Sequence, residues 1–171
     1  MHEIDRQKPI LVTGASGFIA SWIVKYLLED GCTVHATVRD KNLLPKVAHL
    51  QDMGALSKTG SLHLFEADLL TEGSFAEAMQ NCELVIHTAS PFRTKVRNAQ
   101  KELIEPALLG TRNVLQTVNE QEQVKKVVLT SSVAAIMGDA CEIHDTEQHL
   151  FTENHWNLTS DLKHQPMVFG K

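Results

Sequence analysis

Residues 9–20 read Pro-Ile-Leu-Val-Thr-Gly-Ala-Ser-Gly-Phe-Ile-Ala, and this stretch decides the fold. A short apolar run breaks into glycines and then restarts with the spacing of an amphipathic helix. Gly14 permits a tight turn out of a strand, Gly17 lets backbone approach a pyrophosphate, and the small Ala20 lets the helix pack closely on a sheet. The stretch predicts a dinucleotide-binding turn, whose phosphates rest on the N–H groups that open the helix. Glycine-rich turns also arise for purely structural reasons, so the pattern alone leaves both interpretations open.

Length and composition favour one soluble domain. The chain has 171 residues, 43% of them hydrophobic, which is enough for one good core but cramped for a two-domain enzyme. The formal net charge of -5 is modest and the basic residues are dispersed, which argues against a nucleic-acid surface or a polybasic membrane anchor. No apolar run approaches the ~20 residues needed to span a bilayer. We therefore expect a cytoplasmic protein whose partner is a small molecule.

The cysteines and histidines give no sign of a disulfide or a metal site. Cys32, Cys82 and Cys141 are odd in number, far apart and without metal-ligand spacing, which is typical of free thiols in a reducing compartment. Four histidines late in the chain match no helical or zinc-knuckle spacing and lack cysteine partners. They are His144, His149, His155 and His164. We expect them to be loop residues and expect no metal.

The chain alternates short β-branched runs with longer helical patterns, which is typical of a parallel sheet covered on both faces. Strands are expected at Ile10–Thr13, Thr33–Val38, Leu62–Glu66, Leu84–His87 and Lys126–Thr130. Helices are expected at Phe18–Glu29, Leu43–Met53, Ser74–Gln80 and Asn98–Gln121. This order predicts an α/β fold with a doubly wound parallel sheet (Rossmann), forming one NAD(P)-binding domain over residues 1–171. The ligand of such a sheet lies at the carboxyl ends of its strands. Regular patterning fades after about Gly138, so a loop-rich tail is expected.

The end of the second predicted strand bears on the choice of cofactor. It carries Arg39 where a carboxylate would bind a ribose 2′-hydroxyl, and an arginine fork suits a 2′-phosphate. Lys46, seven residues further on, supplies a second positive charge. NADP(H) is therefore the predicted cofactor. Two alternatives stay open, because both cations are also compatible with ordinary surface positions and the adjacent Asp40 is able to serve a ribose.

The other strand ends carry further candidate cofactor contacts. Asp68, followed by Leu69, places a carboxylate where an adenine edge would lie, although an aspartate after a strand is more often a cap or turn residue. The small residues Thr88, Ala89 and Ser90 let backbone approach the ribose and nicotinamide side. The fifth strand ends at Thr130 in a cluster of hydroxyls that also suits a simple turn. His87 is expected to be a packed core residue.

Together these motifs resemble the extended short-chain dehydrogenase/reductase family. The branch that they resemble contains dihydroflavonol reductases, cinnamoyl-CoA reductases and related aldehyde and ketone reductases. The resemblance rests on six segments in family order, namely Val12–Ala20, Thr37–Asp40, Ala67–Leu69, Val85–Pro91, Val127–Ser132 and Phe151–Asn157. It implies that Arg39 and Lys46 hold the 2′-phosphate. It also places Ser16, Phe18 and Ile19, beside the two glycines, in the cofactor site.

The resemblance also implies a catalytic trio, one member of which this chain lacks. Family chemistry uses a serine, a tyrosine and a lysine, the last two spaced Tyr-x-x-x-Lys. Ser132 corresponds to the serine that holds the substrate carbonyl, and Lys171 to the lysine that binds the nicotinamide ribose. Met167 stands at the tyrosine position, and a thioether has no ionisable proton to give. Loss of a general acid costs ~10²–10⁴ in rate.

Three functions therefore stay open at this point. The chain is the cofactor-binding portion of an NADPH-dependent carbonyl reductase with a small-molecule carbonyl substrate, or it is a non-catalytic dinucleotide-binding pseudoenzyme or sensor. A sugar-nucleotide epimerase or dehydratase is disfavoured, because Val133–Ile136 follows the fifth strand in place of an acidic pair. Family members continue for about as many residues again, so we expect the substrate-binding region to lie outside this sequence. The resemblance leaves a homodimer open.

Overall fold

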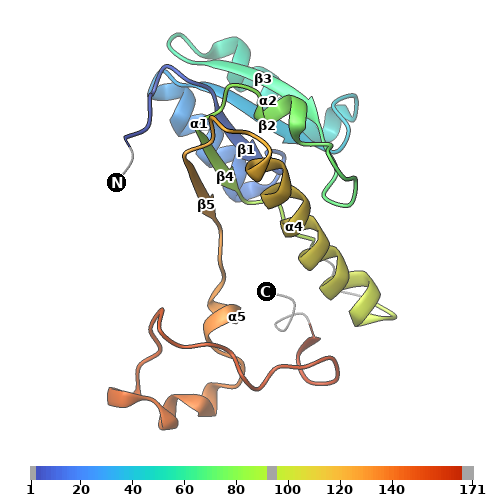
Figure 1. The fold of residues 1–171 in the computed structure, drawn as a ribbon, viewed down its shortest axis with the longest axis vertical. Helices are drawn as coiled ribbons and strands as arrows, with labels where there is room; N and C mark the ends of the chain where they lie inside the picture. Colours follow the sequence, from blue (N-terminus) through green and yellow to red (C-terminus); the bar gives the residue numbers. More distant parts are fainter. Residues whose placement is uncertain (1–2, 92–95, 167–171) are drawn as a thin grey trace. The chain divides into compact units, whose positions relative to one another are not determined.

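The sheet has the predicted doubly wound order. The computed structural model describes residues 3–91 and 96–166. Its five parallel strands lie in the order β3-β2-β1-β4-β5 (Figure 1). They are β1 (Ile10–Thr13), β2 (Thr33–Val38), β3 (Ser61–Glu66), β4 (Leu84–His87) and β5 (Lys126–Leu129). The strand order reverses between β1 and β4, so the carboxyl ends of these two strands flank the crevice where doubly wound sheets bind ligands.

Helices α1 to α4 follow the predicted pattern with shifts at their ends, whereas the short helix α5 was not predicted. They are α1 (Phe18–Glu29), α2 (Leu44–Leu56), α3 (Ala76–Met79), α4 (Glu105–Asn119) and α5 (Val133–Ile136). A π-helical turn at Gln100–Ile104 leads into α4, and short 3₁₀ turns follow α5 at Ala140–Asp145 and Glu147–His149. The expected loop-rich tail is confirmed.

Helix α3 is shorter than the sequence predicted and has only four residues. The hydroxyl of Ser74 donates to the backbone carbonyl of Asp68 and accepts from its N–H, so Ser74 belongs to the preceding turn. At the other end Asn81 adopts a φ of 61°, which no helix accommodates. The longer helix predicted at 74–80 was wrong because local periodicity contains no information about these turn contacts.

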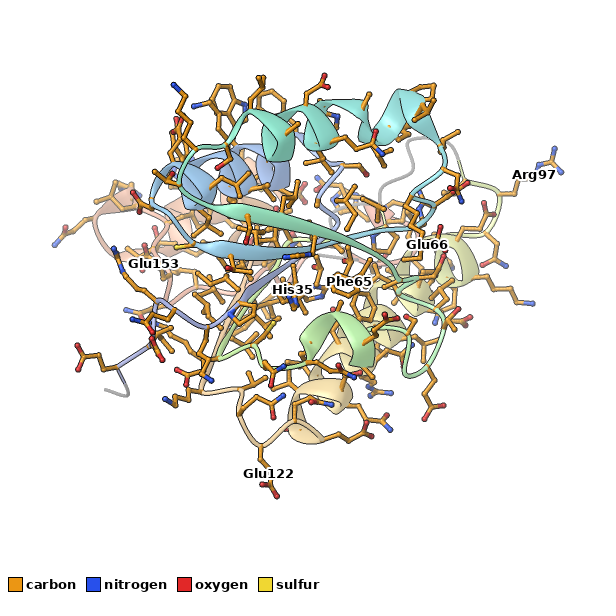
Figure 2. The ribbon with its side chains drawn as sticks, turned by 90° about the horizontal axis from the view of Figure 1, so that it is seen from above. His35, Phe65, Glu66, Arg97, Glu122 and Glu153 are labelled. Atoms are coloured by element: carbon orange, nitrogen blue, oxygen red, sulfur yellow. The ribbon has the colours of Figure 1, made fainter. Side chains whose placement is uncertain are left out.

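Strand β1 is buried on both faces, because its residues alternate between two cores. Ile10 and Val12 pack with residues of α1 and α2, whereas Leu11 packs with Phe75, Met79 and other residues around α3 and α4. In Figure 2 the sheet is seen nearly edge-on between helices, and the labelled His35 and Phe65 belong to the neighbouring strands β2 and β3. This double burial explains why β1 reads as a nearly continuous apolar run rather than as an alternating one.

Helix α4 contacts the loop after β3 through one glycine. A Cβ on Gly110 would lie 2.9 Å from Leu69 Cβ, so only glycine allows the helix to come this close. Three residues further on, Asn113 Nδ2 donates to the Leu69 carbonyl at 2.7 Å. The helix therefore holds the backbone at the end of β3 in place.

The chain forms two compact units, which are described separately. The first, Met1–Ser90 with Gly110–Thr130, contains the sheet. The second comprises Pro91–Leu109 and Ser131–Lys171. Within the second unit, Asn157 binds the α5 backbone, since its side-chain amide donates to Ala134 O and its N–H donates to Ala135 O, both at 2.9 Å.

The cysteines are free thiols, as expected, with Cys32 and Cys82 buried and Cys141 exposed. Burial raises the pKa of the Cys82 thiol to about 12, which leaves it protonated and unreactive. Among the described helices, none combines the length and the apolar character that crossing a membrane requires.

The Gly110 contact yields a stability prediction. At an exposed helix position, Gly→Ala stabilises by roughly 1 kcal/mol, because alanine has the higher helix propensity. At Gly110 we expect the reverse, a loss of about 1–3 kcal/mol in the free energy of unfolding, because the new methyl group overlaps Leu69. Urea denaturation of Gly110→Ala measures this change. A higher urea midpoint for Gly110→Ala than for wild type would contradict the close approach of α4 to Leu69.

Candidate functional site

The glycine turn connects β1 to α1 and has the backbone geometry of an anion cradle. Gly14 adopts a φ of 67°, and a Cβ there would lie 3.0 Å from both Cα and Cβ of Ala89. The Gly17 N–H donates to the Gly14 carbonyl at 2.9 Å and closes the turn. Gly17 is the N-cap of α1, and no side chain caps the helix. The positive end of the helix dipole therefore faces outward with its first N–H groups uncapped.

Three predicted contact residues flank this cradle. Ser16 is half-buried, whereas Phe18 is 81% and Ile19 is 61% exposed at the start of α1. Ala20, predicted to allow close packing, is buried against the sheet. The first turn of α1 thus presents apolar side chains next to its open N–H groups.

A threonine from the neighbouring strand fixes the turn from one side. Thr37, the residue before the end of β2, is buried, and its carbonyl accepts the Ala15 N–H at 2.9 Å. Its hydroxyl accepts the Gly14 N–H at 3.3 Å. Sequence reasoning used Thr37 only as part of a motif. The available signal was a hydroxyl at a position where a buried parallel strand ordinarily carries an apolar residue.

A second threonine fixes the turn from the other side, together with a histidine. The Thr13 hydroxyl lies 2.7 Å from His87 Nδ1 and accepts the N–H groups of Thr88 and Ala89 at 3.2 and 3.1 Å. The Thr88 hydroxyl donates to the Thr13 carbonyl. His87 is buried, as predicted, and burial lowers its pKa to about 4, so the ring is neutral at physiological pH.

At the end of β2, Arg39 and Lys46 are both exposed, and Lys46 lies in the first turn of α2 as predicted. Among the described residues, neither side chain forms an ion pair. The neighbouring Asp40 is engaged locally, since its Oδ1 accepts the Asn42 N–H at 2.8 Å. Glu66, labelled in Figure 2, accepts the Lys41 N–H and ties this loop to the end of β3. The two cations are therefore available to a ligand, while Asp40 stabilises the turn.

At the end of β3, Asp68 performs the turn role that the sequence left open. Its Oδ1 accepts the Leu70 N–H at 2.8 Å. Leu69 is held by Gly110 and Asn113 of α4, two residues that sequence reasoning did not single out. A role of Asp68 toward adenine stays a prediction.

The remaining candidates divide between the two units. Thr88 and Ala89 lie directly after β4 in the network of Thr13, and Ser90 follows them exposed. The Thr130 N–H donates to the His87 carbonyl at 3.0 Å, which places the end of β5 beside that of β4.

Ser132 belongs to the second unit, where its hydroxyl caps α5 by accepting the Ala134 N–H at 3.1 Å. Met167 and Lys171 lie outside the described residues.

Of the late histidines expected in loops, His155 and His164 lie in irregular backbone, whereas His144 and His149 lie in short 3₁₀ turns. His155 Nδ1 accepts the Thr152 N–H, His164 lies 2.9 Å from an Asp139 carboxylate oxygen, and the rings of His144 and His149 are 5.7 Å apart. Within the described part of the chain, no three metal-ligating side chains of His, Cys, Asp or Glu come together.

Comparison with known proteins decides the family. The model of the "NAD dependent epimerase/dehydratase family" matches residues 10–157. The chain belongs to this family. It is 52% identical over 127 residues to cinnamoyl-CoA reductase CAD2 from Medicago truncatula, covering 74% of this chain and 38% of the relative. It is 39% identical over 155 residues to dihydroflavonol 4-reductase from Gerbera hybrida, covering 91% of this chain and 40% of the relative.

A solved structure agrees with this assignment. Gre2 from Candida albicans, crystallised in complex with NADPH, superposes with a TM-score of 0.80 at 34% identity. The match covers 96% of this chain and 49% of Gre2. The predicted resemblance to the reductase branch is confirmed. The chain spans about half the length of this structure, and less than half of the two plant reductases.

The buried histidine predicts a pH dependence of stability. His87 titrates at about 4 in the folded protein and near 6.5 once unfolded, so the unfolded chain binds more protons between these values. The free energy of unfolding should therefore fall by about 3 kcal/mol through this group as the pH drops from 7 to 4. Urea denaturation across this range measures the slope. His87→Asn should flatten it and the exposed-loop control His144→Asn should not, whereas equal slopes for all three proteins would refute the assignment.

Proposed function

We propose that this chain is the NADP(H)-binding portion of a reductase that acts on small aldehydes or ketones. One observation carries the proposal. The uncapped glycine turn at the end of β1 is accompanied by two exposed cations, Arg39 directly after the adjacent strand β2 and Lys46 in the first turn of α2, that have no ion-pair partner among the described residues. An anion cradle next to a cationic strand end suits a pyrophosphate joined to a ribose 2′-phosphate.

The structure offers a test of whether such a dinucleotide fits. Gly14 lies so close to Ala89 that a side chain would have no room, and Gly17 leaves the start of α1 uncapped, so backbone rather than side chains faces the phosphates. Asp40 uses a carboxylate oxygen for its own turn, which supports Arg39 as the residue that meets the ribose substituent. The NADPH complex of Gre2, which matches this chain over nearly its whole length, supports the same cofactor.

The other residues have roles that follow from their places at the strand ends. In this proposal Ser16, Phe18 and Ile19 border the pyrophosphate, while Asp68 and Leu69 border the adenine. Thr88, Ala89, Ser90 and Thr130 border the nicotinamide ribose. The bound reduced nicotinamide supplies a hydride. Ser132 holds the substrate carbonyl by its hydroxyl, and Lys171 binds the ribose and favours proton transfer by its positive charge.

A second candidate function rests on Met167. Its thioether gives no proton, so this chain lacks the general acid of its relatives at the expected position. A dinucleotide-binding pseudoenzyme or sensor would keep the cradle and lose the acid. Free thiols in all three cysteines suit a cytoplasmic location for either function. A homodimer suits both as well.

The cofactor proposal is tested by binding. We expect wild type to bind NADPH more tightly than NADH, because only NADPH carries the 2′-phosphate. Arg39→Ala should weaken NADPH binding by about 10- to 100-fold, the range for a lost charge-assisted hydrogen bond, and leave NADH binding unchanged. Fluorescence titration measures both affinities. Lys58→Ala removes an exposed lysine shortly before β3, at the amino end of the sheet, and is the control that should change neither affinity. Equal affinity of wild type for both cofactors would refute the phosphate role of Arg39.

The two candidate functions are separated by restoring the acid. If the chain supports reduction, Met167→Tyr should raise NADPH oxidation with a small aldehyde by about 10²–10⁴-fold, the usual contribution of a general acid. The change in absorbance of the reduced nicotinamide measures turnover. Unchanged NADPH affinity in the variant is the control for folding. NADPH binding without turnover in wild type, including the case in which only Met167→Tyr turns over, would favour the pseudoenzyme or sensor.

A further inference from the structure

His87 is a buried polar residue that the proposed chemistry does not use. It is the last residue of β4, it is 2% exposed, and it pairs with Thr13 at the last position of β1. Both residues lie directly before the backbone that lines the proposed cofactor site. A buried histidine at this position requires an explanation. An apolar residue would fill the same volume and would not bury a polar group that needs a hydrogen-bond partner.

The hydrogen bonds around the Thr13 hydroxyl determine its orientation. Thr88 N–H and Ala89 N–H both donate to Oγ1, at 3.2 and 3.1 Å, and occupy its lone pairs. The single hydroxyl proton is then directed to His87 Nδ1 at 2.7 Å. This assignment makes Nδ1 an acceptor and puts the ring proton on Nε2. Burial lowers the pKa of His87 to about 4, so the ring is neutral at physiological pH and Nδ1 stays available as an acceptor.

The same contacts extend to the glycine turn. Ala89, fixed by its N–H to Thr13, is the residue whose Cα and Cβ leave no room for a side chain on Gly14. The Thr88 hydroxyl binds back to the Thr13 carbonyl, so the backbone after β4 is held at two points. The position of Ala89 in turn limits the conformation of Gly14.

We propose that His87 is a positioning residue for the cofactor: its Nδ1 orients the Thr13 hydroxyl, which fixes the Thr88 and Ala89 amides against Gly14. The expected effect on cofactor binding rests on the proposed NADP(H) function. The positioning of the two amides by His87 and Thr13 concerns the cofactor-free protein and does not rest on it. Without an acceptor at position 87, the Thr13 hydroxyl proton has to point toward another partner. The rotated hydroxyl group then no longer directs a lone pair at each of the two amides, Thr88 N–H and Ala89 N–H. The end of β4 then loses one of its two anchors.

Binding of NADPH by four variants tests the consequence. His87→Leu removes the acceptor at similar bulk, and His87→Asn keeps one, since its Oδ1 is as many bonds from the backbone as Nδ1. Thr13→Val removes the hydroxyl and Thr13→Ser keeps it. We expect about 10-fold weaker binding for His87→Leu and Thr13→Val, and near wild-type binding for the two conservative variants. The NADPH affinity of each variant is measured under conditions in which circular dichroism shows that the variant is folded.

Thr117→Val is the matched control for the loss of a buried threonine hydroxyl. Thr117 is 1% exposed in α4, and its hydroxyl donates to Asn113 O of the same helix at 2.9 Å. A role in stability alone predicts that this variant and Thr13→Val lower the melting temperature without changing NADPH affinity. NADPH affinity equal to wild type in both His87→Leu and Thr13→Val would overturn the proposal.

Amide hydrogen exchange in the cofactor-free protein separates this proposal from the proposed function. His87→Leu should exchange the Thr88 and Ala89 amides about 10-fold faster than wild type, and His87→Asn should restore the protection. Unchanged exchange at both amides would overturn the positioning role even if NADPH binds. Failure of wild type to bind NADPH would instead refute the proposed function, and the exchange rates would still decide whether His87 fixes the end of β4.

Discussion

The site depends on the close approach of Gly14 to Ala89, where the ends of β1 and β4 meet. Parallel strands deliver their carboxyl ends to one edge of a sheet, and the reversal of strand order between β1 and β4 opens a crevice there. The backbone of one strand end then lies against that of the other, with room for no side chain between them. The glycine turn, the start of α1 and the small residues after β4 all follow from this contact.

Threonine hydroxyls and one imidazole hold the backbone at this edge. The amides of residues just past a strand end have no ladder partner, and an unsatisfied buried amide is costly. Thr37 accepts the Gly14 N–H, and Thr13 accepts the amides of Thr88 and Ala89. The turn is thus fixed from β2 and from β4. Backbone held in this way keeps the uncapped start of α1 in place, and a proposed phosphate ligand would require little reordering of it.

The ionisable side chains around this neutral framework differ in what they do. His87 is kept uncharged by burial, and Asp40 and Asp68 each use a carboxylate oxygen to stabilise their own turns. The exposed cations Arg39, directly after β2, and Lys46, in the first turn of α2, form no ion pair among the described residues. In the proposed function, specificity for a 2′-phosphate and general affinity for a dinucleotide would therefore come from different parts of the site. The first depends on side-chain charge and the second on backbone geometry.

The sequence by itself determined the fold class, the family and the strands, because buried parallel strands and a glycine turn leave a local signature. The bounds of β1, β2, β4 and α1 were predicted to the residue. Helix α3 was overestimated, since the contact of Ser74 with Asp68 that delays its start is not part of any periodic pattern. Only the tertiary structure showed that Thr13, Thr37, His87, Gly110 and Asn113 support the site. Their partners lie 23 to 76 positions away along the chain, and hydrogen bonds between such distant residues exist only once the sheet has brought the strand ends together.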